Sequence, residues 1–506
     1  MTRVHNSIQQ LAVIDIMPID LVEFSSSGRL LIVGSQAQID AVTPHLDGLQ
    51  ITSSLDQPDS ITGWLGNFTV ELKSQTLAFD LILDLMPEPT ISIKVLPLGY
   101  FAPQDNQQTL AEALQQLPDL IGIFDKPRYF QYKPSICAHS RRQVKGCQHC
   151  IDACPAEAIS SSGDTVTVNP SLCQGCGSCT AVCPSGAMTY ALPALDVSLN
   201  RLRVMLKAYF ELETVPPILL IHDENHGQMM IETMADSLSQ TTIAFSIEEI
   251  GALGMPFWLS ALAYGVGHII VWDAGSHNDH DWLELQNEIS KTNEMLTGIG
   301  FDQSISWFSG NNVEQLTQQL SQSETIVIAE RAQFAGVDDK RRMITIALDH
   351  LHKQAPKPIE LLPLNDGAAF GEIEIDKHAC TLCLSCVSVC PVGAVLDGID
   401  KPQLNFIEDL CVQCGMCSNA CPENAITLNP RYLFDREQAR KVRLLYEEPI
   451  FHCIACNKPF ATQKMITTMT EKLKGHAMFQ GAALQRLKMC EDCRVKAMFK
   501  DAQGPM

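Results

Sequence analysis

The chain has 506 residues, 46% of them hydrophobic, and a formal net charge of −22. This acidic balance excludes nucleic-acid binding as the main role, because phosphate contacts need a basic surface. The length is sufficient for several domains with cores of their own. Residues 1–10 contain no continuous apolar stretch and no twin arginine, so the sequence predicts a cytoplasmic protein.

Residues 1–122 predict a small α/β domain whose function the sequence does not indicate. A strand is expected at Leu30–Gly34, a helix over 37–49, and further strands at Phe79–Asp84 and Ile91–Val95. Just beyond this segment, Tyr129 and Phe130 are interpreted as ordinary core residues, with a position beside a cofactor or partner as the alternative.

All 20 cysteines fall into metal-ligand spacings. Sixteen form four runs that each end in Cys-Pro: Cys137, Cys147, Cys150 and Cys154; Cys173, Cys176, Cys179 and Cys183; Cys380, Cys383, Cys386 and Cys390; Cys411, Cys414, Cys417 and Cys421. The last three runs match the C-x2-C-x2-C-x3-C-P pattern of bacterial iron-sulfur proteins, in which the fourth cysteine binds a neighbouring cluster. The runs therefore predict two two-cluster modules, at 123–195 and 366–432. Disulfides or zinc are the weaker alternatives.

These runs resemble two-cluster bacterial ferredoxins, and the resemblance implies four 4Fe-4S clusters with defined ligands. In the first module it implies one cluster on Cys137, Cys147, Cys150 and Cys183, and a second on Cys173, Cys176, Cys179 and Cys154. In the second module it implies Cys380, Cys383, Cys386 and Cys421 for one cluster, and Cys411, Cys414, Cys417 and Cys390 for the other. The segments Thr165–Val168 and Leu404–Ile407 predict the small strands of this fold.

The first run departs from the pattern, because residues 138–146 separate Cys137 from Cys147 where two residues are usual. This leaves His139, His149 or a three-iron cluster open as alternatives, although thiolate is the standard ligand and favours Cys137. The run also lies among basic residues: Lys126, Arg128, Lys133, Arg141, Arg142 and Lys145. They predict either local compensation of cluster charge or a docking surface for an acidic redox partner.

Residues 196–365 predict a doubly wound α/β domain. Apolar strand candidates alternate with helical stretches near 227–239, 256–264 and 282–297, a pattern typical of a parallel sheet covered on both faces; the strands are Leu219–Ile221, Thr242–Phe245, His268–Trp272 and Thr325–Ala329. No nucleotide-binding motif follows these strands. Segments 245–254 and 291–300 faintly resemble the small delta subunit that joins methanogen hydrogenases to heterodisulfide reductase, which implies at most a fold and a contact role.

One stretch of this domain, residues 250–272, is long and apolar enough to be considered as a membrane span. Its four glycines, its one proline and its acidic flanks instead favour a buried helix near 256–264 followed by a buried strand. The sequence therefore predicts no membrane span.

Residues 433–506 predict a metal-binding tail. The pairs Cys453/Cys456 and Cys490/Cys493 are typical of a zinc ribbon, so one zinc ion is expected, with a fifth iron-sulfur cluster as the alternative. His452 and His476 are interpreted as surface residues. From Arg431 onward the chain has 14 Lys and Arg against 8 Asp and Glu, a net of +6, which leaves −28 for the preceding residues.

The segments around Ile136–Ser140, Gly146–Pro155, Cys411–Cys417 and Lys488–Val495 resemble bacterial cytoplasmic polyferredoxins that accompany molybdenum-dependent formate dehydrogenases. The resemblance implies an electron-transfer subunit without catalysis of its own, with a formate dehydrogenase as one candidate partner. A cofactor-binding subunit of a larger redox enzyme and a non-redox assembly scaffold remain alternatives. The expected fold is a multi-domain α/β and α+β chain, in which two ferredoxin-like modules flank the parallel-sheet domain.

Overall fold

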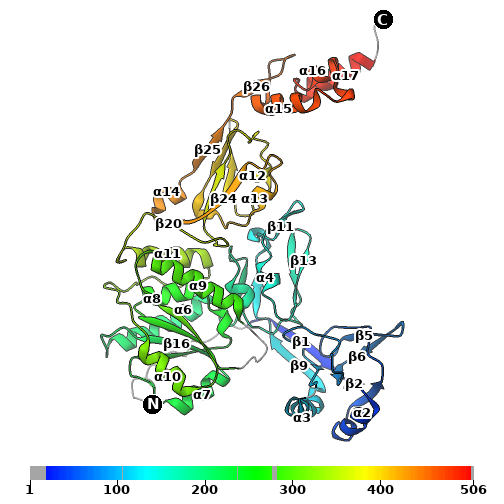
Figure 1. Ribbon diagram of the computed structural model, residues 1–506, viewed down its shortest axis with the longest axis vertical. Coiled ribbons are helices and arrows are strands. Elements are labelled where there is room, and N and C mark those ends of the chain that lie inside the picture. Colours follow the sequence, from blue (N-terminus) through cyan, green and yellow to red (C-terminus); the bar gives the residue numbers. More distant parts are fainter. Residues whose placement is uncertain (1–18, 105, 236, 276–281, 400, 503–506) are drawn as a thin grey trace. The chain divides into compact units, whose positions relative to one another are not determined.

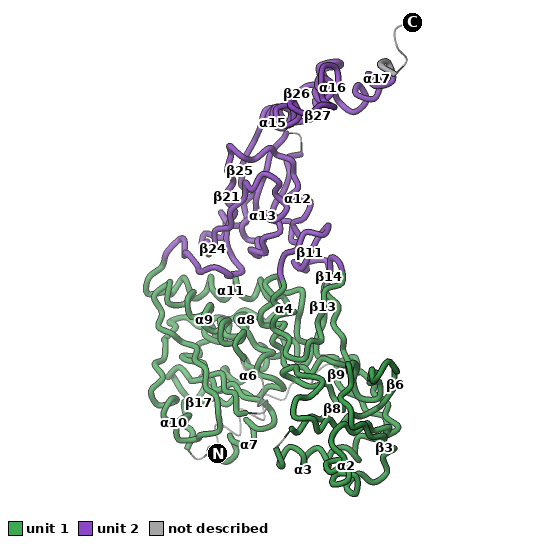
Figure 2. The backbone as a smooth tube through the Cα atoms, turned by 45° about the vertical axis from the view of Figure 1, so that its right-hand side comes forward, with its two compact units in different colours: residues 1–133, 148–162, 166–358 green, residues 134–147, 163–165, 359–506 purple. Residues whose placement is uncertain are grey.

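The computed structural model describes residues 19–104, 106–235, 237–275, 282–399 and 401–502. The chain forms two compact units (Figure 2). The first unit contains the residues up to 133 together with 148–162 and 166–358, and the second contains 134–147, 163–165 and the residues from 359 onward. A short segment of the first cysteine run thus belongs to the same unit as the whole second module.

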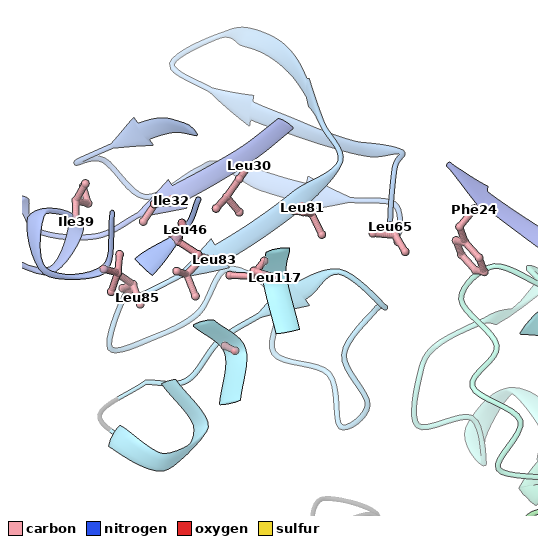
Figure 3. Packing of buried hydrophobic residues seen from close by; sticks show 12 residues of the cluster. Phe24, Leu30, Ile32, Ile39, Leu46, Leu65, Leu81, Leu83, Leu85 and Leu117 are labelled. Carbon is pink, nitrogen blue, oxygen red and sulfur yellow. The ribbon is translucent and has the colours of Figure 1, made fainter. Parts of the chain in front are cut away.

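The N-terminal part of the first unit contains a parallel four-stranded sheet in the order β3-β2-β7-β8. Its strands are β2 (Arg29–Val33), β3 (Gln50–Ser54), β7 (Leu81–Asp84) and β8 (Tyr100–Phe101), and its helices are α2 (Gln36–Val42) and α3 (Gln107–Gln116). A second, antiparallel sheet holds β4 (Ser60–Thr62), β5 (Phe68–Leu72) and β6 (Gln75–Phe79), while β1 (Leu21–Ser26) pairs with β9 (Gly122–Pro127). Leucine and isoleucine side chains of β2 and β7 form the core (Figure 3).

Three of the elements predicted for this part differ in the structure. The strand expected at Phe79–Asp84 is split, because the buried carboxylate of Asp80 lies in a bend and accepts hydrogen bonds from Arg29. The strand expected at Ile91–Val95 does not form; the backbone N–H of Ile91 instead donates to the hydroxyl of Tyr100. The first helix ends at Val42 and continues only as a 3-10 turn to His45.

The larger sheet of the first unit is parallel and has the order β17-β16-β18-β19. Its strands are β16 (Ile218–Asp223), β17 (Thr242–Ile247), β18 (His268–Asp273) and β19 (Ile305–Ser309). The helices are α6 (Leu195–Phe210), α7 (His226–Met234), α8 (Met255–Ala263), α9 (Leu283–Gly298), α10 (Val313–Gln322) and α11 (Lys340–His352). Helices α7 and α10 pack on one face, and α8 lies on the other with α6, α9 and α11 against it (Figure 1). The predicted parallel sheet with helices on both faces is confirmed.

The apolar stretch 250–272 forms the buried helix α8 and the buried strand β18, as the sequence predicts. Among the residues that the structure describes, no helix has both the length and the apolar character needed to cross a bilayer. The strand predicted at Thr325–Ala329 is wrong, since β19 is the fourth strand. Ile326 and Ile328 are buried, but Val327 between them is 71% exposed. The alternation of buried and exposed side chains here belongs to an irregular segment that forms no strand.

The first module contains β10 (Phe130–Tyr132), α4 (His149–Asp152), β13 (Ile159–Ser162), β14 (Thr165–Val168), α5 (Ser178–Ala181) and β15 (Met188–Tyr190). Two short strands, β11 (Ser140–Arg141) and β12 (Val144–Lys145), lie between Cys137 and Cys147. The second module contains β20 (Leu361–Pro363), β21 (Gly371–Ile375), α12 (Ser385–Val389), β22 (Val395–Asp397), β23 (Gln403–Phe406), α13 (Met416–Asn419), β24 (Ile426–Leu433), α14 (Arg436–Arg440) and β25 (Arg443–Glu447). The tail contains β26 (Ile450–His452), β27 (Pro459–Thr462), α15 (Gln463–Leu473), α16 (Ala482–Arg486) and α17 (Glu491–Ala502). The small strands expected at 165–168 and 404–407 are present as β14 and β23.

Candidate metal centres

One pocket of the first unit gathers four cysteines: Cys154, Cys173, Cys176 and Cys179. Cys173 and Cys176 come from the loop that leads into α5, Cys179 lies in α5, and Cys154 follows α4. The loop turns at Gly177, whose φ of 81° favours glycine and where an added Cβ would lie 2.4 Å from the backbone nitrogen of Ala252. These are the four residues that the ferredoxin resemblance assigns to one cluster.

The buried thiols of this pocket suit a cationic metal cluster. Burial raises the pKa of Cys176 to about 12. Burial also raises the pKa of Cys179 well above its ordinary value, and the neighbouring Cys176 and Cys173 add to that increase. Thiolates so enclosed need a positive counter-charge, which the iron ions of a cluster supply. The donor set of four sulfurs is the one that a 4Fe-4S cluster requires.

Three further residues lie around this pocket: Lys126, which the sequence identifies only as a basic residue near the run, and Tyr129 and Tyr190. The ammonium group of Lys126 donates to the backbone oxygens of Ser171 (2.8 Å) and Cys173 (2.7 Å). The Tyr190 hydroxyl donates to the backbone oxygen of a loop glycine at 2.8 Å, and its ring stacks on Tyr129 with centroids 6.2 Å apart. Both tyrosines line the pocket, so the interpretation of Tyr129 as an ordinary core residue is incomplete. The available clue was their nearness in sequence to the cysteine runs.

The second module has a comparable pocket, lined by Cys380, Cys383, Cys386 and Cys421 together with apolar side chains of β23 and β24. Burial raises the pKa of Cys386 to about 12. The Sγ atom of Cys383 lies 3.4 Å from the hydroxyl of Ser385. The structure therefore brings together a second group of four that the resemblance assigns to one cluster.

The remaining cysteines of this module, Cys390, Cys411, Cys414 and Cys417, lie at its core. Cys411 is buried in the same apolar cluster that Cys390 and Cys417 border. Burial raises the pKa of Cys414, and the nearby charge of Cys390 raises it further. The side-chain amide of Gln413 donates to the Sγ atom of Cys411 at 3.4 Å. Burial raises the pKa of Cys417, and the nearby Cys411, Cys414 and Cys390 raise it further. The assignment of these four residues to one cluster stays a prediction.

The Cys-Pro end of the runs has a repeated geometry. In three runs the sulfur of the last cysteine accepts the backbone N–H of the alanine four residues later, at 3.2 to 3.3 Å; the pairs are Cys154 and Ala158, Cys390 and Ala394, Cys421 and Ala425. At Cys183 the donor is the N–H of Met188, at 3.4 Å. Such donors stabilise a thiolate and influence cluster potential.

The predicted ligands of the remaining cluster are divided between the units. Cys137 and Cys147 belong to the second unit, and Cys150 and Cys183 to the first. His139 is buried and its Nδ1–H donates to the backbone oxygen of Cys147 at 3.0 Å, which gives this histidine a structural role in the loop. The ligand set of this cluster stays a prediction.

The basic residues near the first run do not all form a free surface. The guanidinium of Arg141 donates to the backbone oxygen of Cys390 at 3.2 Å, and Lys126 is bonded beside Cys173 as described above. Arg142 and Lys145 are exposed. For Arg141 and Lys126 the geometry favours the local role over the docking surface.

The tail brings its four cysteines into one group. The sulfurs of Cys453, Cys456, Cys490 and Cys493 all lie within 4.8 Å of one another. Burial opposes ionisation of Cys453, but backbone N–H donors, Cys490 among them, outweigh it and lower its pKa to about 6. His452 and His476 are exposed, and Nδ1 of His476 accepts the N–H of Met478 at 3.3 Å. The group suits a tetrahedral metal ion, and the sulfurs alone do not distinguish zinc from iron.

All 20 cysteines lie in the described part of the chain, and each carries a free thiol.

Comparison with known proteins supports the two modules. Residues 124–187 and residues 379–426 each match the 4Fe-4S dicluster domain family. Similar proteins include the pyruvate synthase subunit PorD of Thermotoga maritima, 36% identical over 13% of this chain and 64% of that protein. Hydrogenase-4 component A of Escherichia coli is 39% identical over 11% of this chain and 25% of that protein. The ferredoxin-type protein NapF of Haemophilus influenzae is 37% identical over 12% and 37%.

The chain spans between 25% and 64% of the length of these relatives. A formate dehydrogenase, heterodisulfide reductase and formylmethanofuran dehydrogenase complex from Methanospirillum hungatei aligns with 66% of this chain, with a TM-score of 0.18 and 15% identity. At those values a shared fold does not follow. The matches nevertheless agree with the cysteine geometry: the chain contains two 4Fe-4S dicluster domains of the ferredoxin type.

Proposed function

We propose that this chain relays electrons through four 4Fe-4S clusters to or from a partner oxidoreductase and has no catalysis of its own. The observation that carries the proposal is the gathering of four thiols around one pocket in each module, at Cys154, Cys173, Cys176 and Cys179 and at Cys380, Cys383, Cys386 and Cys421. Enclosed clusters with N–H donors on their sulfurs are suited to reversible one-electron exchange.

The proposal assigns the other two clusters to Cys137, Cys147, Cys150 and Cys183 and to Cys411, Cys414, Cys417 and Cys390. It assigns a structural zinc ion to Cys453, Cys456, Cys490 and Cys493. The support for the zinc ion is the compact group of four sulfurs, which lacks the third cysteine and the Cys-Pro of a ferredoxin loop.

We place this chain in a larger redox assembly. Two of its relatives are named as components of larger enzymes, a pyruvate synthase and a hydrogenase. The sequence resemblance to polyferredoxins favours a formate dehydrogenase as the partner. Purification of the chain from its native source under anaerobic conditions, followed by identification of the proteins bound to it, tests this part of the proposal.

The cluster count is tested by iron analysis. Anaerobically reconstituted protein is expected to contain about 16 iron atoms per chain. Replacement of Cys176 by Ala should remove about 4 of them and leave the second module unchanged, because Cys176 lines the first-module pocket and the second module belongs to the other unit. Thr167→Ala, at an exposed position of β14 in the same module, is the control and should keep all the iron. An iron content near 8 per chain in the unaltered protein would contradict four clusters.

Electron transfer itself is tested by redox titration. The clusters should be reduced and reoxidised without loss of iron, with EPR signals that appear and disappear reversibly. Clusters that hold iron but cannot be reduced would support the scaffold alternative. Resolved flavin bands beneath the broad cluster absorption would support the cofactor-binding alternative.

A further inference from the structure

The segment inserted between Cys137 and Cys147, residues 138–146, forms a clamped turn that we call the insertion hairpin. Its turn residues Arg142 and Gln143 have φ values of 52° and 67°, a left-handed conformation that is uncommon outside glycine. The carboxylate of Asp164 accepts the N–H groups of both, at 2.9 and 3.2 Å, and the hydroxyl of Ser140 at 3.2 Å. These three hydrogen bonds offset the cost of the turn and fix the hairpin in one shape.

Both strands of the insertion hairpin are bonded to the second module, within the second unit. Arg141 on β11 donates to the backbone oxygen of Cys390, directly after α12, at 3.2 Å. The side-chain amide of Asn419, the last residue of α13, donates to the backbone oxygen of Lys145 on β12 at 3.0 Å. Figure 2 shows β11 in the same unit as α12 and α13.

An apolar contact completes this attachment. Ala138 at the start of the insertion hairpin and Met416 on α13 are 3% and 0% exposed and share one small core with Val412. At Gly146 a Cβ atom would lie 2.5 Å from the backbone oxygen of Ala138 and 2.7 Å from Cγ of Met416. The hairpin is therefore packed against α13 at a distance that leaves no space for a side chain at position 146.

Two cysteines from different modules border this same core. Cys147 closes the insertion hairpin, and Cys414 lies in the loop that leads into α13; both pack against the group that contains Ala138 and Met416. In the proposed ligand sets these two residues hold different clusters. Arg141 adds a positive charge at Cys390, which the same proposal makes a ligand of the Cys414 cluster.

We propose that the insertion hairpin is the electron bridge between the two ferredoxin modules. This inference rests on the proposed electron-transfer function. One electron leaves the reduced cluster on Cys147 and enters the oxidised cluster on Cys414, or the reverse; one cluster is oxidised, the other is reduced, and no proton or covalent bond changes partner. Arg141 of the hairpin and Asn419, which donates to Lys145, are positioning residues that hold Cys147 and Cys414 against one shared core.

The test uses the full-length chain with its clusters. The variant Arg141→Ala with Asn419→Ala removes both polar contacts, and Arg142→Ala is the matched control, since that exposed side chain lies in the same turn. A photoreduced deazaflavin delivers less than one electron per chain, and rapid-freeze EPR follows its redistribution between the modules. Redistribution is expected in the unaltered chain and in the control, and its loss is expected in the double variant at unchanged iron content. Arg141→Lys, which keeps a positive charge at this position, should retain part of the electron redistribution.

Trypsin cleavage after Lys145 shows whether the hairpin has been released. Gly146→Val, which forces a side chain against Met416, serves as the second variant. Unchanged redistribution in a variant that trypsin cleaves after Lys145 faster than it cleaves the unaltered chain would overturn the bridge alone. A chain whose clusters cannot be reduced at all would overturn the proposed function, and the bridge with it.

Discussion

Single residues near the clusters combine structural and electrostatic roles, and Lys126 is the clearest example. Its ammonium group lies 5.0 Å from the ring centroid of Phe24 and donates to two backbone oxygens, one of them that of Cys173. Burial lowers its pKa to about 8, so the group is still charged at neutral pH. A fixed positive charge beside a cluster with four thiolates favours the reduced state, which carries one more negative charge.

We therefore expect Lys126→Met to make the reduction potential of the cluster at Cys173 more negative. A shift on the order of 60 mV corresponds to a tenfold change in a one-electron equilibrium constant. EPR-monitored redox titration measures it. The exposed Lys133, changed to Met, is the control and should leave the potential unchanged. A potential that does not move in the Lys126 variant, with iron retained, would show that the charge compensation lies elsewhere.

Asp80 gives the N-terminal sheet a defined dependence on pH. Burial raises the pKa of this carboxyl, but hydrogen bonds from Arg29 and Ser27 outweigh burial and lower it to about 2. Because the folded pKa lies below the unfolded value of about 3.9, the contribution to stability is complete above about pH 5 and is lost as pH falls toward 2.

For this carboxylate we expect a contribution of about 2 kcal/mol to the unfolding free energy of the N-terminal domain. Asp80→Asn should lower the denaturant midpoint of that domain at neutral pH and weaken its dependence on acid. Asp47→Asn, at an exposed carboxylate of the same domain, should do neither. Equal midpoints for the Asp80 variant and the unaltered chain would refute the assignment.

At the scale of elements, the sequence predicted what local pattern determines. Continuous apolar runs gave β16, β17 and β18, and cysteine spacing identified the two four-thiol pockets. The strand β19 was missed because Ser306, Trp307 and Phe308 are only half-buried and carry no apolar run, while the more apolar segment at 325–329 forms no ladder. The attachment of the insertion hairpin was not predictable, since Arg141 and Cys390 are 249 positions apart and nothing local marks the pair.

The tail elements depend on their metal group. Cys490, one of the four ligands, is 3% exposed, and the described residues of α15, α16 and α17 supply few buried apolar side chains of their own. We expect Cys490→Ser to release the metal and to unfold the tail locally, because a structural metal ion supplies much of the folding free energy of such a module. Hydrogen exchange of residues 450–499 measures the unfolding.

The second module should keep its iron in this variant. Met489→Leu, at the neighbouring position, is the control and should keep both the metal and the protection from exchange. If elemental analysis of the tail finds iron and labile sulfide, the metal group is a fifth cluster and the zinc assignment is wrong.

At the scale of the whole molecule, charge is distributed unevenly along the chain. The residues from 431 onward are net basic, while those before them are strongly acidic. Part of the basic excess is used within the second unit: Lys472 lies 3.1 Å from Glu423, and Arg431 is paired with Glu372 and Glu408. Such pairs leave a smaller basic surface for an acidic partner than the composition suggests.

The insertion hairpin also has a consequence for biosynthesis. Its contacts connect residues 249 and 274 positions apart, so the segment that carries Cys137 and Cys147 leaves the ribosome long before α13 exists. At about 5–20 residues per second, that interval is roughly 12–55 s. During this time the thiol of Cys147 lacks the surface on which it packs. We therefore expect the first-module pocket, whose four cysteines are complete by residue 179, to receive its iron before the cluster site at the hairpin, which gains its packing surface only when α13 has been made.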